Sequence, residues 1–216
     1  MSILAEFWGE YGCFSRPEFK TERVSYDVIT PSAARGLIES IMWHPGLNWV
    51  IDRIYVRAPI AFVNIRRNEV SAKISASNVR TAMKTQEPLY LSTQSNIQQR
   101  ATMALTNVHY IIEAHFCLNN QAAFGDNAGK FQEMIKRRLR KGQCYSQPYF
   151  GTREFAAHFS LCETIPPCPE ELLGEKDLGY MLYDMDFSDM ENIQAMYYRA
   201  IMRDGVIDLT NVEVMR

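Results

Sequence analysis

The segment Val108–Leu118 (VHYIIEAHFCL) has the most regular alternation of side chains in the chain. Successive side chains of a β-strand point to opposite faces of a sheet, so its apolar residues share one face and predict a half-buried strand. His109, Glu113 and His115 share the other face. Positions i, i+4 and i+6 of a strand lie too far apart to converge on one ion, so we expect a polar outer face and no metal site.

Strand and helix signals alternate on both sides of this segment. Thr30 and Pro31 predict a helix start, because threonine caps a helix and proline needs no donor at the first position. Asp126 and Asn127 predict a second start, and Gly142 predicts the end of that helix. Further strands are expected at Ile3–Trp8, Trp49–Arg57, Ile60–Ile65 and Arg153–Leu161. This order predicts an α+β, ferredoxin-like (RRM-type) core with an antiparallel sheet.

Residues 66–106 separate the two halves of this pattern. They show no steady period and are rich in Arg, Gln, Asn, Ser and Thr. A loop of this length inside a compact domain is usually functional or disordered. We therefore expect a long, mobile, basic excursion from the sheet.

The proline-rich stretch Ile165–Pro169 (IPPCP) predicts a boundary between a domain of residues 1–165 and a small C-terminal β subdomain of residues 166–216. Leu178–Phe187 alternates as a strand. Met196–Leu209 fits either a helix or a hairpin. We favour the hairpin, because Asp204-Gly205 is typical of a type I′ turn.

The composition excludes several classes of protein. With 216 residues, 47% apolar and 22% charged, the chain can build a core and is not disordered. No apolar run approaches the ~18 residues of a membrane span, and the N-terminus does not resemble a signal peptide, so we expect no membrane association. Five cysteines without a C-x-x-C pair fit a reducing cytoplasm and not a disulfide scaffold.

The net charge of −2 hides a division along the chain. Residues 1–150 carry 18 basic and 12 acidic side chains, whereas residues 151–216 carry 5 and 13. The positive charge concentrates in Arg53–Arg100 and Lys130–Arg153, where acidic residues are scarce. Surfaces that form salt bridges mix both signs, so these segments favour a polyanion over an ordinary solvated face. We expect a bound nucleic acid, such as RNA on a ferredoxin-like sheet, to stay within the first 153 residues, with Tyr145, Tyr149 and Phe150 available to stack on bases.

Two further patterns carry weak chemical signals. Cys144 and His158 form a possible nucleophile and base, but a buried, inert cysteine is the better interpretation. Gly125–Lys130 lacks the spacing of a phosphate-binding loop and is rejected as one. It still places the Lys130 ammonium beside a helix N-terminus, which suits one phosphate.

Several motifs together resemble one family, the CRISPR-associated Cas-five (Cas5) proteins of subtype I-C, or Dvulg, in the RAMP superfamily. They follow one another in the expected order along nearly the whole chain: RVSYDVITPSAARG (23–36), WVIDRI (49–54), NIRRNEV (64–70), QQR (98–100), EAHF (113–116), DNAGK (126–130), QPYFGTREF (147–155) and DLGYMLYDMDF (177–187).

The resemblance implies an endoribonuclease, independent of metals and cofactors, that cuts precursor CRISPR RNA within its repeats. The ribose 2′-OH attacks the adjacent phosphate and leaves a 2′,3′-cyclic phosphate. Lys130 matches the family's catalytic lysine, but Met42 and Phe131 occupy the positions of its proton-transfer residues, and neither can transfer a proton. His44 and Tyr149 are the two replacement candidates. The implied partners are repeat RNA and mature guide RNA, the other subunits of a type I-C surveillance complex, and possible target DNA.

The residues expected to bind RNA come from the two basic segments and the matching motifs: Arg23, Arg35, Arg66, Arg67, Lys73, Gln98, Arg100, Lys136, Arg137, Arg138, Arg140, Lys141 and Arg153. Three functions stay open at this point. The chain is an active endoribonuclease, a non-cleaving subunit that binds the 5′ handle of the guide RNA, or a ferredoxin-like domain that binds a protein through other surfaces.

Overall fold

The computed structural model describes residues 2–19 and 21–216. Its centre is an antiparallel run of strands in the order β6-β1-β5-β3. Ala5 lies opposite Ile112, and Ile51 lies opposite Ala114, and all four side chains are buried. The predicted strand Val108–Leu118 is confirmed as the inner half of β5. The bounds are β1 Ile3–Gly12, β3 Leu47–Val56, β5 Ile97–Leu118 and β6 His158–Leu161.

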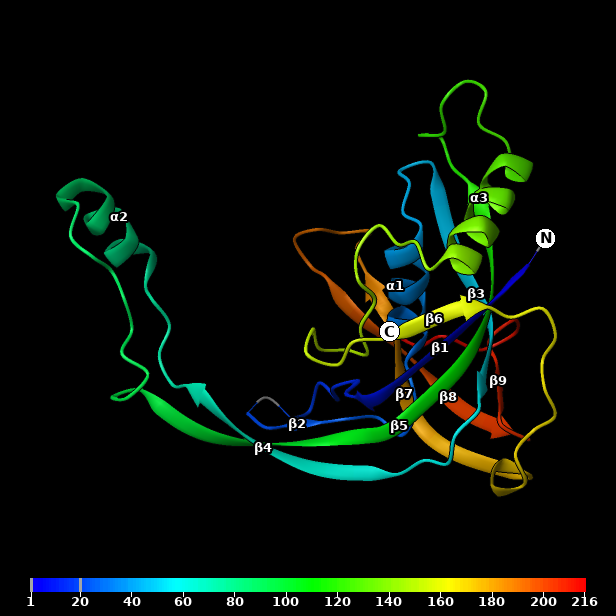
Figure 1. Ribbon diagram of the computed structural model, residues 1–216, viewed down its shortest axis with the longest axis horizontal. Helices are drawn as coiled ribbons and strands as arrows, with labels where there is room; N and C mark the ends of the chain where they lie inside the picture. Colours follow the sequence, from blue (N-terminus) through cyan, green and yellow to red (C-terminus); the bar gives the residue numbers. More distant parts are fainter. Residues whose placement is uncertain (1, 20) are drawn as a thin grey trace.

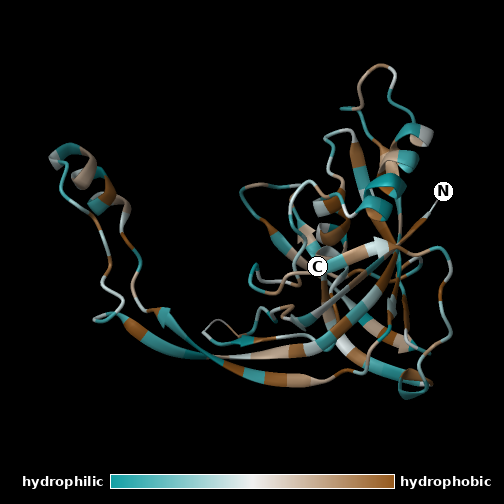
Figure 2. Cartoon of the chain, in the orientation of Figure 1, coloured by the Kyte–Doolittle hydropathy of each residue, from teal (hydrophilic) through white to brown (hydrophobic). Residues whose placement is uncertain are grey.

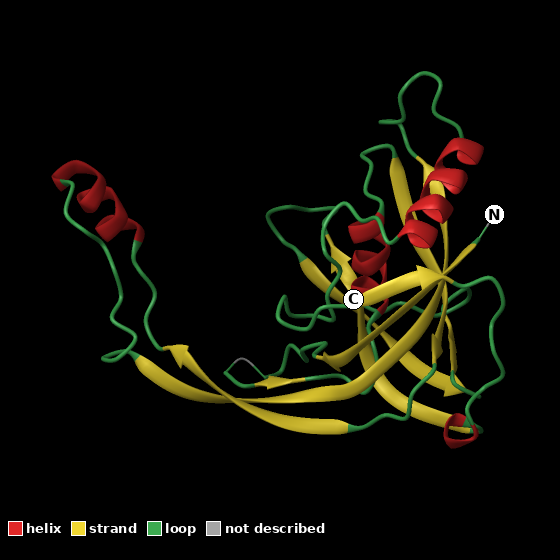
Figure 3. Cartoon of the chain, in the orientation of Figure 1, coloured by secondary structure: helices red, strands yellow, loops and turns green. Residues whose placement is uncertain are grey.

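Helices α1 (Pro31–Ile41) and α3 (Ala128–Lys141) cover one face of this sheet (Figures 1 and 3). The Thr30 side chain accepts a hydrogen bond from the Ala33 N–H at 3.3 Å, and the Asn127 side chain accepts one from the Lys130 N–H at 2.9 Å. Gly142 ends α3 with a positive φ of 63°. Both predicted helix starts and the predicted end of α3 are confirmed, because each depends on a local capping interaction.

The core lies between the two helices and the sheet. Ile38 and Ile41 of α1 and Phe131 and Ile135 of α3 are buried in one cluster with the apolar residues of the strands. Figure 2 shows that hydrophobic residues also appear along the projecting part of the molecule, where little covers them. Each fully buried side chain of the size of isoleucine or phenylalanine contributes about 1.5–3 kcal/mol to stability. The packing therefore fixes α1 and α3 beside each other.

Residues 62–105 form an arm that projects from this body (Figure 1). Strand β4 (Phe62–Val70) pairs antiparallel with the outer part of β5, and helix α2 (Ala76–Thr85) lies at the tip. The predicted excursion at residues 66–106 does project from the body, but it is not a loop, because most of these residues belong to β4, α2 or β5. Its mobility stays a prediction. The alternation was hidden because much of the ladder faces water and carries polar side chains on both faces. Strand β2 (Arg23–Val24) adds a short parallel pairing to β5.

The C-terminal strands join the same sheet through β9, which pairs with β3. Their bounds are β7 Glu175–Asp186, β8 Gln194–Arg203 and β9 Val206–Asp208, after a short 3₁₀ turn at Glu170–Leu172. Asp204 and Gly205 have φ of 48° and 73°, as a type I′ turn requires, so the predicted hairpin is confirmed. The predicted closing strand begins at His158 and not at Arg153. The boundary at residues 165–166 stays a prediction.

No helix among the described residues combines the length and the apolar character needed to cross a membrane.

Candidate functional site

A cluster of four residues lies where the chain leaves α1 and enters α3, and we call it the Lys130 cluster: His44, Asp126, Lys130 and Phe131. The Lys130 ammonium donates a hydrogen bond to the Asp126 carboxylate at 2.8 Å. His44 Nε2 lies 3.9 Å from the other oxygen of the same carboxylate. The His44 and Phe131 ring centroids are 4.9 Å apart. The structure thus brings His44 and Lys130 together around one acidic residue.

Asp126 lies between the Lys130 ammonium and the His44 ring. Its side chain is only 6% exposed, and it also accepts a hydrogen bond from the Ala123 N–H at 3.0 Å. The hydrogen bond from Lys130 holds the pKa of the Asp126 carboxyl below its usual value, with further help from the Ala123 N–H and the His44 side chain. The carboxylate is therefore ionised at neutral pH and holds the Lys130 ammonium in an ion pair.

The hydrogen bonding of His44 decides what this side chain can do. The Gly46 N–H donates to His44 Nδ1 at 3.0 Å, so Nδ1 acts as the acceptor and the ring proton belongs on Nε2. In this state Nε2 offers a hydrogen-bond donor. Because Nε2 already carries the ring proton, it can accept another only after its own proton has moved to Nδ1. A proton on Nδ1, in the neutral or the doubly protonated ring, breaks the hydrogen bond from Gly46.

The two positions that resemble the family's proton-transfer sites hold buried apolar side chains. Met42 and Phe131 are each 1% exposed. The Met42 carbonyl accepts a hydrogen bond from the Trp49 indole at 3.1 Å, and the Phe131 ring lies under the Lys130 ammonium at 5.6 Å. Both side chains therefore pack in the core and carry no group that moves a proton.

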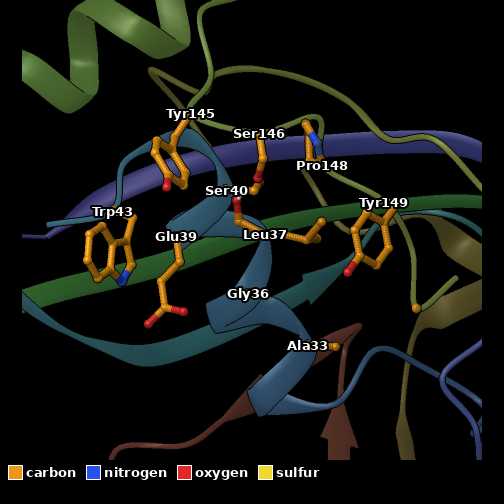
Figure 4. Close-up of a pocket in the computed structure, with 11 residues that line it drawn as sticks. Ala33, Gly36, Leu37, Glu39, Ser40, Trp43, Tyr145, Ser146, Pro148 and Tyr149 are labelled. Carbon is orange, nitrogen blue, oxygen red and sulfur yellow. Dashed lines mark hydrogen bonds between the residues drawn. The ribbon is translucent and has the colours of Figure 1, made fainter. Parts of the chain in front are cut away.

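Tyr149 belongs to a different feature, a hollow of about 370 Å³ beside α1 (Figure 4). We call it the aromatic hollow. It contains no member of the Lys130 cluster, so Tyr149 and Lys130 line separate parts of the surface. Its walls come from α1, from Trp43 and from the loop after α3: Ala33, Gly36, Leu37, Glu39, Ser40, Trp43, Tyr145, Ser146, Pro148, Tyr149 and Gly151.

Helix α3 carries most of the second basic segment. Arg138 donates to the Ile41 carbonyl at 2.7 Å, and Arg140 pairs with Glu163 at 3.0 Å on the surface. Lys136, Arg137 and Lys141 have no ion pair with any residue that the structure describes. The helix therefore presents at least three cations that are not neutralised within the chain.

The arginines at the base of the arm are arranged differently. Arg23 pairs with Glu69 at 2.7 Å, Arg100 lies 3.5 Å from the same carboxylate, and Arg67 lies 3.7 Å from it and also pairs with Glu154. Gln98 accepts a hydrogen bond from Arg100 at 3.1 Å.

The remaining predicted RNA-binding residues fall into two groups. Arg35, on α1, pairs with Asp184 of β7 at 3.0 Å and lies 3.6 Å from Glu39. Arg66, Lys73 and Arg153 are exposed and have no acidic partner among residues 2–19 and 21–216.

The other polar candidates have separate partners. His109 contacts Glu6 at 2.8 Å, and His115 contacts Asp52 at 2.9 Å. Glu113 accepts hydrogen bonds from Arg53 and from Tyr55, and burial together with this carboxylate raises the pKa of Tyr55 to about 12. Within the described ranges, no group of three His, Cys, Asp or Glu side chains could hold a metal ion.

Three contributors to these sites carried no functional signal in the sequence. Asp126 predicts only a helix start, although its spacing of four residues from Lys130 is a usual one for an ion pair. Trp43 and Glu39 gave no signal, because a single exposed aromatic or acidic residue near a helix end is common. Only the fold shows that Tyr145 lies beside Trp43.

The chain resembles known proteins over nearly its whole length. The family model for Cas5d, described as a CRISPR-associated protein (Cas5), matches residues 2–210. A protein of Mannheimia succiniciproducens named CRISPR pre-crRNA endoribonuclease Cas5d is 49% identical over 213 residues, 96% of this chain and 94% of that protein. A protein of the same name from Thermus thermophilus is 43% identical over 187 residues, 86% of this chain and 73% of that protein.

Two solved structures share the fold. A crystal structure of a CRISPR-associated protein has a TM-score of 0.69 at 18% identity and covers 100% of this chain and 97% of that chain. A functionally uncharacterized protein from Streptococcus mutans has a TM-score of 0.69 at 20% identity, with the same coverage of both chains. At such identities the likeness concerns the fold alone.

Proposed function

We propose that this chain, which belongs to the CRISPR-associated Cas5 family as a Cas5d protein, is a metal-independent endoribonuclease. It cleaves precursor CRISPR RNA within repeats. The observation that carries the proposal is the 49% identity, over 96% of the chain, to a protein named for this activity. The product remains bound through its 5′ handle, and the chain assembles with other subunits of a type I-C surveillance complex.

The proposed core is ferredoxin-like. The strand order β6-β1-β5-β3, with every neighbouring pair antiparallel, supports this assignment, as do α1 and α3 on one face. In this arrangement each helix follows one of the two inner strands, β1 or β5, and returns the chain to an outer strand, β3 or β6. The segment that follows α1 then passes the start of α3, where His44 meets Phe131 in the Lys130 cluster.

The proposed chemistry is an attack of the ribose 2′-OH on the neighbouring phosphate. The 2′-O–P bond forms, the P–O5′ bond breaks, and the products are a 2′,3′-cyclic phosphate and a 5′-OH. The 2′-OH loses its proton to solvent water, and the leaving 5′ oxygen gains one from water. Lys130 exchanges Asp126 for the phosphate and stabilises the charge that develops on the phosphorane. The first N–H groups of α3 add to this attraction, because a helix N-terminus favours anions. His44 Nε2–H donates a hydrogen bond to the same phosphate, and it transfers a proton only after it has released the Gly46 N–H.

A second candidate function is the non-cleaving binding of the 5′ handle. The burial of Met42 and Phe131 favours it, because these side chains fill the positions of proton-transfer residues with groups that cannot transfer protons. Under this hypothesis the Lys130 cluster binds a phosphate and goes no further.

The RNA path proposed for either function follows the cations that lack an acidic partner within the described chain: Arg66, Lys73, Lys136, Arg137, Lys141 and Arg153. Arg35, Arg138 and Arg140 and the arginines around Glu69 can join it only by exchanging the partners they now have.

One assay separates the two functions. Purified protein is incubated in EDTA with repeat RNA and with the same RNA carrying a 2′-deoxy nucleotide at the cut. We expect cleavage of the first and none of the second. Lys130→Ala should slow cleavage by about 100-fold or more, since one lost donor to a transition-state oxyanion costs this much, and should change the affinity by less than about threefold.

The matched control is Lys176→Ala, which removes an exposed lysine from β7. It should cleave like the wild type. Tight binding without product in the wild type would leave the handle-binding function. Normal cleavage by Lys130→Ala would show that the site lies elsewhere.

A further inference from the structure

The aromatic hollow has the shape and lining of a site for a flat, partly polar ligand. Trp43 and Tyr145 form one end, with ring centroids 6.1 Å apart and planes tilted by 31°. They are 54% and 67% exposed, so their faces are open to a ligand. Tyr149 stands at the other end, and small residues of α1 form the floor between them (Figure 4).

The walls of the hollow are held by buried contacts. The Ser40 carbonyl at the end of α1 accepts hydrogen bonds from the N–H groups of Tyr145 at 2.8 Å and Ser146 at 3.0 Å. Phe150 is fully buried and anchors the same loop. Gly151 has a φ of 81°, and a Cβ there would lie 1.9 Å from the Cys13 carbonyl, so only glycine allows this close approach. The hollow is thus preformed, as expected for a binding site.

One charged side chain reaches into the hollow. The Glu39 carboxylate points in the same direction as the Trp43 indole (Figure 4). Its nearest cation among the described residues, Arg35, lies 3.6 Å away and is itself held by Asp184. Burial raises the pKa of Glu39, because the charged form loses water without gaining a strong donor. The carboxylate repels a phosphate and attracts N–H donors, so it suits the edge of a base.

The position of the hollow links it to the Lys130 cluster. Trp43 is the residue between Met42, which is buried in the core, and His44, which belongs to the cluster. Lys141 precedes Tyr145 by four residues, and Arg153 follows Gly151 by two. A strand of RNA whose phosphate lies at Lys130 therefore finds open aromatic rings for a neighbouring base and cations on both sides of the loop.

We propose that the aromatic hollow binds one unpaired nucleobase of the bound RNA, stacked on Trp43 and Tyr145, with Glu39 accepting hydrogen bonds from its edge. A guanine suits the site best, because its N1–H and amino group present two adjacent donors to one carboxylate. Uracil suits it least, because carbonyl oxygens flank its single N–H. This proposal rests on the RNA-binding part of the proposed function and does not require cleavage.

The test uses repeat RNA in which single nucleotides are replaced, one at a time, by the fluorescent base 2-aminopurine, whose emission falls when it stacks on aromatic rings. We expect strong quenching at one position near the cut. Trp43→Ala should restore the emission there and weaken binding by about 5- to 150-fold, the range for loss of one stacked base. At that position, Glu39→Gln should reduce the preference for guanine over uracil.

A filling variant gives an independent test. A Cβ at Gly36 meets nothing within 4 Å, and Gly36 is helical, so Gly36→Leu places a side chain in the hollow while it improves helix propensity. It should remove the quenching without lowering the thermal midpoint of unfolding. The control is Tyr180→Ala, which removes an exposed tyrosine from β7 and should change neither binding nor emission.

The outcomes separate the two proposals. Position-specific quenching that both variants abolish supports the hollow as a base site, even if no product forms and the cleavage proposal fails. Quenching that persists in Gly36→Leu and Trp43→Ala, or RNA that binds without quenching at any position, overturns the base site. Absence of RNA binding overturns both.

Discussion

The base of the arm and helix α3 are both rich in cations, but the cations have opposite surroundings. At the base of the arm, Arg23, Arg67 and Arg100 converge on Glu69. On α3, Lys136 and Arg137 have no acidic partner in the part of the chain that the structure describes. The same residue types thus form an ion-pair network around Glu69 in one place and leave unneutralised charge in the other. Counting basic residues along the sequence cannot make this distinction.

The largest expected effect concerns the free cations. Replacing Lys136, Arg137 and Lys141 by alanine should weaken the binding of repeat RNA on the order of 50-fold at physiological salt, because three phosphate contacts are lost. The magnitude of the slope of log K against log salt should fall by about 2 for the same reason. Fluorescence anisotropy over a salt series measures both. The matched control replaces Lys176, Arg199 and Arg203, and an equal loss of slope there would contradict an RNA path confined to the first 153 residues.

The second effect concerns the ion-pair network around Glu69. Glu69→Gln leaves three arginines without their shared carboxylate, and since Glu69 is partly exposed we expect a loss of about 1 kcal/mol in the free energy of unfolding. Urea unfolding measures it. The slope of RNA binding against salt should not fall. An unchanged urea midpoint would show that the network adds nothing to stability.

The third effect follows the pH. The folded pKa of Asp126 lies below its unfolded value of about 3.9. Its contribution to stability is therefore present above that value and is lost as the pH falls through the folded pKa. The difference in urea midpoint between wild type and Asp126→Asn should be constant from about pH 5 to 8 and should shrink below pH 4. A difference that grows in acid would contradict the ion pair with Lys130.

The smallest effect is expected for Arg140→Ala. The pair of Arg140 with Glu163 lies on the surface, where such pairs contribute about 0–1 kcal/mol. We expect a change below about 0.5 kcal/mol in the free energy of unfolding. A larger loss would show that this end of α3 is held more tightly than its exposure indicates.

Local signals in the sequence predicted local features correctly. Thr30 with Pro31, Gly142, and Asp204 with Gly205 each act through their own backbone within one turn of the chain, so their outcome depends little on the rest of the fold. The strand Val108–Leu118 was also clear, because one face is buried and the other is not.

Features that depend on distant partners were missed. In the arm, Arg67 lies opposite Arg100 and Asn68 lies opposite Gln99, so the ladder has no apolar alternation to detect. The aromatic hollow joins residues about a hundred positions apart, Trp43 and Tyr145, and no spacing rule connects them. The proximity of His44 to Lys130 was expected from family resemblance. The hydrogen bond that fixes the His44 ring comes from Gly46, only two residues away, but a histidine and a glycine at this spacing in a loop predict no such contact.

The continuous strand β5 also sets a length scale for whatever the protein binds. Its 22 residues cover roughly 70 Å at about 3.3 Å each. The part that pairs with β4, Ile97–Leu105, accounts for about 30 Å of this path and carries α2 away from the body. A ligand that runs along this ladder from the body toward α2 follows about 30 Å of strand, which a mononucleotide cannot do and a strand of several nucleotides can.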